Sequence, residues 1–90
     1  MKPLNWAIIG LGRFGKIHAR VLQGLPEINL VAACGRNPQR LEQHAQEVGI
    51  QELTTDYQEL LNRDDIDVVS ITTHWQEHFE VTQAALASGK

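Results

Sequence analysis

Three glycines near the amino terminus have the spacing of a phosphate-binding turn. Gly10, Gly12 and Gly15 match the pattern G-x-G-x-x-G. The first glycine allows a tight turn out of a strand, the second lets a pyrophosphate approach the backbone, and the third lets a helix pack closely on that strand. Free amides and the dipole at the start of the helix then attract the phosphates. The motif predicts dinucleotide binding if a strand precedes it and a helix follows; the alternative is a glycine-rich turn that only joins two packed elements.

The residues around the motif supply both elements. Residues 5–9 form a short apolar run closed by a glycine, which is typical of a strand buried on both faces. Downstream, apolar residues recur at spacings of 3, 4 and 4 and so occupy one stripe of a helix: Phe14, Ile17, Val21 and Leu25. We interpret Trp6 and Phe14 as core aromatic residues.

The rest of the chain alternates between strand-like and helix-like segments. Strands are predicted at 28–33, 52–54 and 67–72. Helices are predicted after Asn37, after Asp56 paired with Glu59 as caps, and over about 76–88. Right-handed crossovers convert four strands and four helices in alternation into a parallel sheet covered on both faces. The predicted fold class is α/β: a Rossmann-type doubly wound parallel sheet, incomplete, with strand order 3-2-1-4.

The end of the second predicted strand bears on which dinucleotide binds. An Asp or Glu about 20 residues past the glycines normally accepts hydrogen bonds from the adenosine ribose of NAD. Gly35 and Arg36 stand there instead. With no carboxylate at this place to repel a phosphate, and a guanidinium that can pair with one, NADP is favoured. NAD is the second choice, because loss of the acid permits NADP without requiring it, and Arg36 as a solvated surface arginine is the alternative.

Two further signals follow the fourth predicted strand. Ligands in open parallel sheets bind outside the carboxyl ends of strands, so Thr72 and Thr73 are expected to border the nicotinamide half of a cofactor, unless they form a plain loop. The segment from His74 to His78 also matches H-x-x-E-H, a zinc signature of one metallopeptidase group. His74 is expected in the turn before the helix, with few residues left for a third ligand, so a zinc hydrolase is a distant alternative.

Composition excludes several classes of partner. The formal net charge is −3 and no stripe of Lys or Arg appears, so nucleic acid and anionic membranes are poor candidates. No apolar run approaches the ~20 residues of a membrane span. Cys34 is the only cysteine, so neither an internal disulfide nor a cysteine-based zinc site is possible, and a cytoplasmic location is expected. Two other histidines are expected to pack or to make hydrogen bonds: His18 and His44.

The whole pattern resembles the amino-terminal NAD(P)-binding domain of the glucose-fructose oxidoreductase, inositol dehydrogenase and MocA-like family. The segments that carry the resemblance follow in order along nearly all ninety residues: Ile8–Gly12 running on to His18, Asn37-Pro38, Tyr57–Leu61, Ile66–Val69, Thr73 with His78, and Ala84–Leu86 closing on Gly89-Lys90. The chain departs from the family at His74-Trp75, where Pro-Asn is usual after the threonine.

The resemblance implies an NAD(P)-dependent oxidoreductase that transfers a hydride between the nicotinamide and a sugar, cyclitol or related hydroxy compound. It also implies three groups of cofactor-binding residues: Gly10, Gly12, Arg13, Phe14 and Gly15 around the pyrophosphate; Gly35 and Arg36 at the adenosine phosphate; Thr72, Thr73 and His78 near the nicotinamide ribose and diphosphate.

Family members continue into a fifth strand with Glu-Lys-Pro, whose lysine is the expected acid/base, and then into a substrate domain. Residues 1–90 are therefore expected to be a truncated dinucleotide-binding domain with no catalytic residue, inactive by itself, whose small-molecule substrate binds through the missing domain. A stand-alone nucleotide-sensing module is the alternative. The fourth strand, with Val68, Val69 and Ile71, would be an exposed apolar edge, which predicts self-association.

Overall fold

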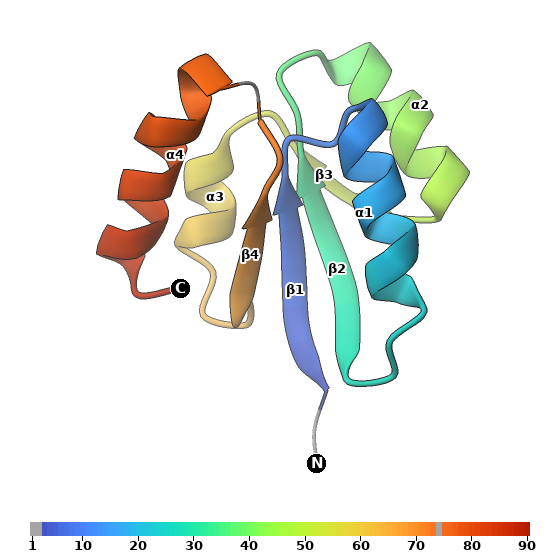
Figure 1. Cartoon of the computed structure of the whole chain (residues 1–90), viewed down its shortest axis with the longest axis horizontal. Helices are drawn as coiled ribbons and strands as arrows, with labels where there is room; N and C mark the ends of the chain where they lie inside the picture. Colours follow the sequence, from blue (N-terminus) through green and yellow to red (C-terminus); the bar gives the residue numbers. More distant parts are fainter. Residues whose placement is uncertain (1–2, 74) are drawn as a thin grey trace.

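Four parallel strands and four helices alternate along the chain (Figure 1). The structure is a computed structural model that describes residues 3–73 and 75–90, with side chains from residue 78 onward in the last helix. The strands are β1 (Leu4–Ile9), β2 (Ile28–Cys34), β3 (Glu52–Thr54) and β4 (Val68–Ile71). The helices are α1 (Arg13–Gln23), α2 (Pro38–Val48), α3 (Tyr57–Leu61) and α4 (Trp75–Ser88).

The sheet has the order β3-β2-β1-β4, as predicted. All pairs are parallel, with Ile8 of β1 opposite Ala33 of β2 and Ser70 of β4. The carboxyl ends of the strands therefore share one edge of the sheet, where α1 and α4 begin (Figure 1). That edge is where ligands bind in doubly wound sheets.

Each face of the sheet has its own apolar core. On one face, Ile8 packs with Leu22 of α1 and Leu41 of α2. On the other, Ile9 packs with Leu60 of α3 and Val81 of α4. The doubly covered sheet follows from strands that are apolar on both faces. In the described part of the chain, no helix is both long enough and apolar enough to cross a membrane.

The apolar stripe of α1 does not face the sheet, and the assignment of Phe14 to the core was wrong. The buried residues of α1 are Gly15, Ala19 and Leu22. The side chain of Phe14 is 69% exposed, and Ile17 and Val21 are exposed as well. Leu25, the last member of the predicted stripe, lies beyond the end of α1 at Gln23. Small residues let α1 lie close to the strands. The apolar period predicted the helix correctly, but the prediction that its large apolar side chains face the sheet was wrong, because they face solvent.

A polar cluster attaches α1 to the outer strand. The indole Nε1 of Trp6 donates to the hydroxyl of Ser70 at 2.6 Å. The imidazole Nε2 of His18 lies 3.0 Å from the same oxygen. His18 is thus a hydrogen-bonded histidine, as predicted, and Trp6 is a partly buried aromatic residue packed against the core.

Helix caps are mostly as the sequence predicts. The side chain of Asn37 accepts from two amides of α2, and that of Asp56 accepts from the Gln58 amide of α3. Glu59 does not reach back to Asp56, as a reciprocal capping pair would require. Its carboxylate accepts instead from the Thr54 hydroxyl at 2.6 Å, and that hydroxyl accepts from the Asp56 amide.

Gly15 sets how closely α1 approaches the strand ends. A methyl group built on it would lie 2.5 Å from the Gly10 carbonyl oxygen and 3.1 Å from the Thr72 hydroxyl. Both distances are shorter than ordinary contacts, and the nearer one is to backbone. The position requires glycine because of space.

We predict that Gly15→Ala destabilises the fold by about 1–3 kcal/mol, because the added methyl pushes α1 off the turn before it. Urea unfolding checks this. Gly24→Ala is the matched control on the same helix, because a methyl there would meet its nearest atom at 3.5 Å. Equal stability of the two variants would contradict the close approach.

Candidate functional site

The first glycine makes a sharp turn at the end of β1. Gly10 has φ of +103°, a conformation that side chains rarely adopt. The amides of Gly10 and Leu11 both donate to the Cys34 carbonyl oxygen, at 2.8 and 3.0 Å. These bonds hold the turn on the end of β2.

Thr72 holds the same turn from the other side. Its hydroxyl donates to the Gly10 carbonyl oxygen at 2.7 Å, and its amide donates to Ile9 at 2.9 Å. A methyl group built on Gly10 would lie 2.7–2.8 Å from the backbone of Thr72 and Thr73. Thr72 therefore lies beside the predicted cradle, and its hydroxyl positions the turn.

Gly12 differs from the glycines on either side of it, because the space above it is open. No atom of the described residues would lie within 4 Å of a methyl group built there. Gly12 is also the N-cap of α1, and no described side chain caps that end. The amides of Arg13, Phe14 and Gly15 follow in the first turn, where helical N–H groups lack a carbonyl partner one turn earlier. The structure brings all five predicted pyrophosphate residues into this one turn.

The basic side chains in and after the glycine turn differ in exposure and in ion pairing. Arg13 and Arg36 are exposed. Lys16 is engaged elsewhere: its ammonium lies 2.6 Å from Glu47 of α2. That hydrogen bond is the main reason why the pKa of Glu47 lies below its ordinary value, with a smaller contribution from His44. The first turn of α1 therefore keeps a positive dipole end and an exposed arginine, whereas its lysine is neutralised by a carboxylate.

Gly35 and Arg36 follow β2, next to the glycine turn. The Gly35 amide donates to the Thr54 carbonyl oxygen of β3 at 3.2 Å. Because the amides of Gly10 and Leu11 bind Cys34, the glycine turn and the end of β2 are in direct contact. Arg36 is thus two residues from the contact with the glycine turn, and Gly35 stands where an acid would stand in an NAD site.

The third predicted group lies at the end of β4. Thr73, His78, Phe79 and Thr82 line a hollow of about 420 Å³. The Thr73 hydroxyl is buried and has no hydrogen-bond partner among the described residues. His78 is exposed, and its Nδ1 lies 3.3 Å from the Thr82 hydroxyl. The sequence did not indicate Phe79 and Thr82 as site residues, although Thr82 stands four residues after His78 and three after Phe79, spacings that bring side chains together on a helix.

A larger hollow lies elsewhere. It occupies about 670 Å³ between α2 and the end of β3, beside Leu41 and Leu53. None of the predicted site residues line it, so its size alone does not make it the functional site.

Only part of the zinc motif lies among the described residues. His74 lies outside the described residues, so the structure says nothing of a pairing with His78. Elsewhere in the described ranges, no group of three or more His, Cys, Asp or Glu side chains could hold a metal ion.

Comparison with known proteins gives relatives along the whole chain. A glycosyl hydrolase family 109 protein of Shewanella pealeana is 33% identical over 99 residues, which cover 100% of this chain and 22% of that protein. The crystal structure of scyllo-inositol dehydrogenase from Lactobacillus casei with bound NAD(H) and scyllo-inositol superposes with a TM-score of 0.86 and 33% identity, covering 99% of this chain and 26% of that one. Biliverdin reductase from Synechocystis, in complex with biliverdin and NADP+, gives a TM-score of 0.89 and 30% identity, covering 99% and 28%.

The chain thus spans about a quarter of the length of these relatives. The family described as "Oxidoreductase family, NAD-binding Rossmann fold" matches residues 4–90. This match confirms the resemblance that the glycine motif and the later segments indicated. The chain belongs to the glucose-fructose oxidoreductase, inositol dehydrogenase and MocA-like family of oxidoreductases, and it has the NAD-binding Rossmann fold of that family.

Proposed function

We propose that this chain binds NADP, or less tightly NAD, as the cofactor-binding part of an oxidoreductase. The reaction transfers a hydride between the nicotinamide and a sugar, cyclitol or related hydroxy compound. The single observation that supports the proposal best is the contrast among the three glycines. Gly10 and Gly15 have no room for a methyl group, whereas Gly12 faces open space within the part of the chain that is described.

The pyrophosphate fits at Gly12. The amides of the first turn of α1 and the positive end of its dipole suit an anion, and Gly12 has no side chain to keep it away. The helices α2 and α3 have side-chain caps, from Asn37 and Asp56, at the corresponding ends. The backbone of Gly12, Arg13 and Phe14 would therefore bind the two phosphates.

The nicotinamide end fits at the carboxyl end of β4. The buried Thr73 hydroxyl lacks a partner among the described groups, and a ribose hydroxyl or carboxamide would supply one. His78 borders the same hollow. When bound, the nicotinamide supplies or accepts the hydride, whereas this chain's residues bind and orient it. The acid or base that moves the substrate proton is proposed to lie outside these ninety residues.

The preference for NADP is argued from charge. Arg36 is exposed, two residues from the contact of Cys34 with the glycine turn, and Gly35 brings no carboxylate that would repel a 2′-phosphate. Among proteins similar to this chain, one structure holds NAD(H) and another NADP+. The preference therefore depends on this chain's own residues.

Gly12→Ala should weaken binding of NADP and of NAD at least about tenfold, that is by ~1.4 kcal/mol or more, because the methyl occupies the place of the pyrophosphate. Its unfolding midpoint should fall only slightly, because alanine is a poorer N-cap than glycine, whereas the methyl meets no atom beyond its chain neighbours and φ is −112°. Calorimetric titration measures binding, with Gly24→Ala as the control. Undiminished affinity would exclude the pyrophosphate from this turn.

Arg36→Ala should weaken NADP binding about ten- to a hundredfold and leave NAD binding nearly unchanged, since a charged hydrogen bond contributes roughly 1.5–3 kcal/mol. Arg20→Ala removes a comparable exposed charge from α1 and serves as the control. Titration of both variants with both dinucleotides provides the comparison. An equal loss for NAD and NADP would assign Arg36 a role other than phosphate recognition.

Thr73→Val should leave stability unchanged or slightly higher, because it removes a buried hydroxyl that has no described partner. Binding of NADP should weaken by about two- to tenfold if that hydroxyl bonds the nicotinamide half. ADP, which lacks that half, should bind both proteins equally. A loss of ADP affinity, or no loss for NADP, would place Thr73 away from the nicotinamide.

A further inference from the structure

Lys16 stands where its side chain could serve the proposed phosphate cradle. It directly follows the glycine motif, and its amide donates to the Gly12 carbonyl oxygen at 2.9 Å. Lys16 therefore lies one helical turn after Gly12 on the same face of α1. Helical side chains lean toward the N-terminus of their helix, and a lysine is long enough to span the ~5.4 Å of one turn. Without a partner of its own, its ammonium could reach the open space at Gly12.

Glu47 of α2 holds that ammonium elsewhere. The Lys16 Nζ lies 2.6 Å from the Glu47 Oε2, and the two side chains are 23% and 44% exposed. The hydrogen bond from Lys16 is the largest cause of the lowered pKa of the Glu47 carboxyl, so both groups are charged at neutral pH. The positive charge of Lys16 is therefore balanced within the protein.

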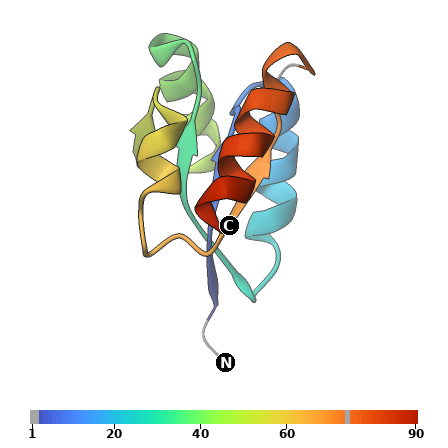
Figure 2. The ribbon, with the colours of Figure 1, turned by 90° about the vertical axis from the view of Figure 1, so that its left-hand side faces the viewer.

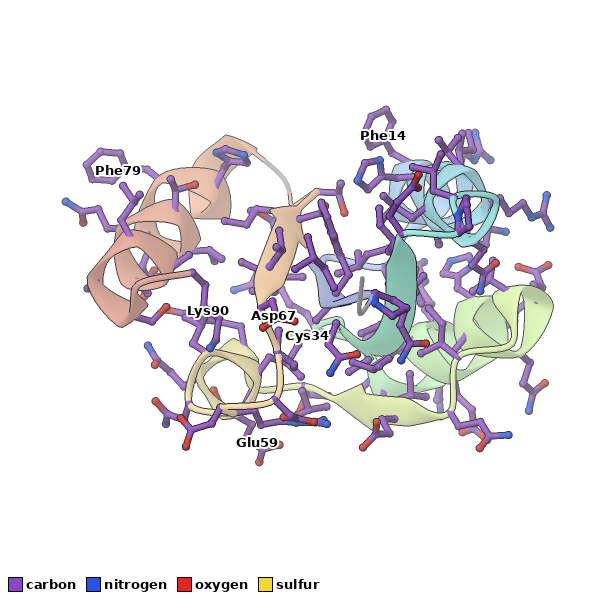
Figure 3. All side chains as sticks on the ribbon, turned by 90° about the horizontal axis from the view of Figure 1, so that it is seen from below. Phe14, Cys34, Glu59, Asp67, Phe79 and Lys90 are labelled. Atoms are coloured by element: carbon purple, nitrogen blue, oxygen red, sulfur yellow. The ribbon has the colours of Figure 1, made fainter. Side chains whose placement is uncertain are left out.

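The position of α2 sets the direction in which Lys16 is drawn. Figure 1 shows α1 and α2 side by side on one face of the sheet, and in Figure 2, seen from α3 and α4, both lie behind the strands. Phe14 projects from α1 on the side away from α2 (Figure 3). Lys16 follows Phe14 by two residues, or about 200° around the helix, and so points toward α2.

The salt bridge also draws Lys16 away from the edge of the sheet where ligands bind. The helix α2 begins at that edge, after the carboxyl end of β2, and Glu47 lies in its last turn. The ammonium is thus held toward the far end of α2. A carboxylate at this place keeps the lysine from the amides at the start of α1.

The salt bridge is not the main link between the two helices. The Gln23 side chain donates to the Val48 carbonyl oxygen at 2.6 Å, and Leu22 and Leu41 pack in the same core. Exposed ion pairs contribute little to stability by comparison. The helices should therefore keep their places without the Glu47 carboxylate, and its removal should act chiefly on the charge near the glycine turn.

We propose that Glu47 is a positioning residue that lowers the affinity for dinucleotides by withholding Lys16 from the pyrophosphate. The inference rests on the proposed function, because it requires a pyrophosphate at Gly12. A lysine binds phosphate as a point charge, and such charged contacts are stronger than neutral ones. A dinucleotide must either displace Glu47 from Lys16 or bind through the backbone amides without the lysine. Both routes give a higher Kd than the freed lysine would.

Calorimetric titration of Glu47→Ala tests the proposal. Binding of NADP and of NAD should tighten by about three- to tenfold, and equally for both, because both contain the pyrophosphate. Glu42→Ala is the matched control, since Glu42 is exposed on the same helix and its loss changes the net charge equally. An equal gain in Glu42→Ala would assign the effect to net charge. A gain for NADP alone would move Lys16 to the 2′-phosphate. Either result would overturn the proposal.

A double-mutant cycle shows whether Glu47 acts through Lys16. Adding Lys16→Met to Glu47→Ala should abolish the gain, so that the double variant binds like Lys16→Met alone. The same gain in both backgrounds would mean that the carboxylate repels the phosphates directly, which would overturn the proposal. The gain should also shrink as sodium chloride rises from about 0.05 to 0.5 M, because salt screens exposed charges. A gain that salt leaves unchanged would contradict it.

The salt bridge can be checked without any dinucleotide. In Lys16→Met, the pKa of the Glu47 carboxyl, followed by carbon NMR, should rise toward its ordinary value, because its main hydrogen-bond donor is lost. An unchanged pKa would overturn the proposal. Circular dichroism verifies folding, and Glu47→Gln, which keeps the length of the side chain, should give a smaller gain in the same direction. Wild-type protein that binds neither dinucleotide would overturn the proposed function as well, whereas binding without a gain in Glu47→Ala would overturn this inference alone.

Discussion

The contact between the Gly10 turn and Thr72 is the constraint on which the rest of the site depends. The turn is held from the β2 side by two amides on Cys34 and from the β4 side by the Thr72 hydroxyl. Gly15 then packs on the Gly10 carbonyl, and this contact fixes where α1 begins. The turn is enclosed at Gly10 and at Gly15 but not at Gly12. The free amides at the start of α1 are therefore accessible from the side of Gly12.

The same arrangement explains the two faces of α1. At its first turns the helix has space beneath it only for small residues, Gly15 and Ala19, whereas Leu22 enters the core further along. The apolar stripe with Phe14, Ile17 and Val21 lies on the outer side of the helix. The close approach at Gly15 and the outward position of this stripe thus belong to the same placement of α1. The distance between helix and strand can change little, because protein interiors tolerate few voids or overlaps.

Much of the fold could be read from local patterns. The order of the elements, the caps at Asn37 and Asp56, and the inward residues Val81 and Ala85 agree with the sequence, since each depends on the period of apolar residues or on a single side chain and its neighbours. Phe14 did not agree, because a periodic stripe shows that a helix is amphipathic but not which surface covers it. Phe79 and Thr82 were missed, because the hollow they line arises only when α4 lies beside the end of β4.

The sequence alone determined the family, the alternation of strands and helices, and the glycine spacing that makes a phosphate cradle possible, because these are properties of neighbouring residues along the chain. Only the tertiary structure decided that Gly12 is open whereas Gly10 and Gly15 are enclosed. The atoms that enclose Gly10 come from Thr72 and Thr73, about sixty residues later, and Gly15 is enclosed by the Gly10 carbonyl together with the Thr72 hydroxyl. The contacts of Thr72 with the glycine turn depend on the crossover of the chain from β3 to the far side of β1, and no local pattern encodes how closely two packed elements approach.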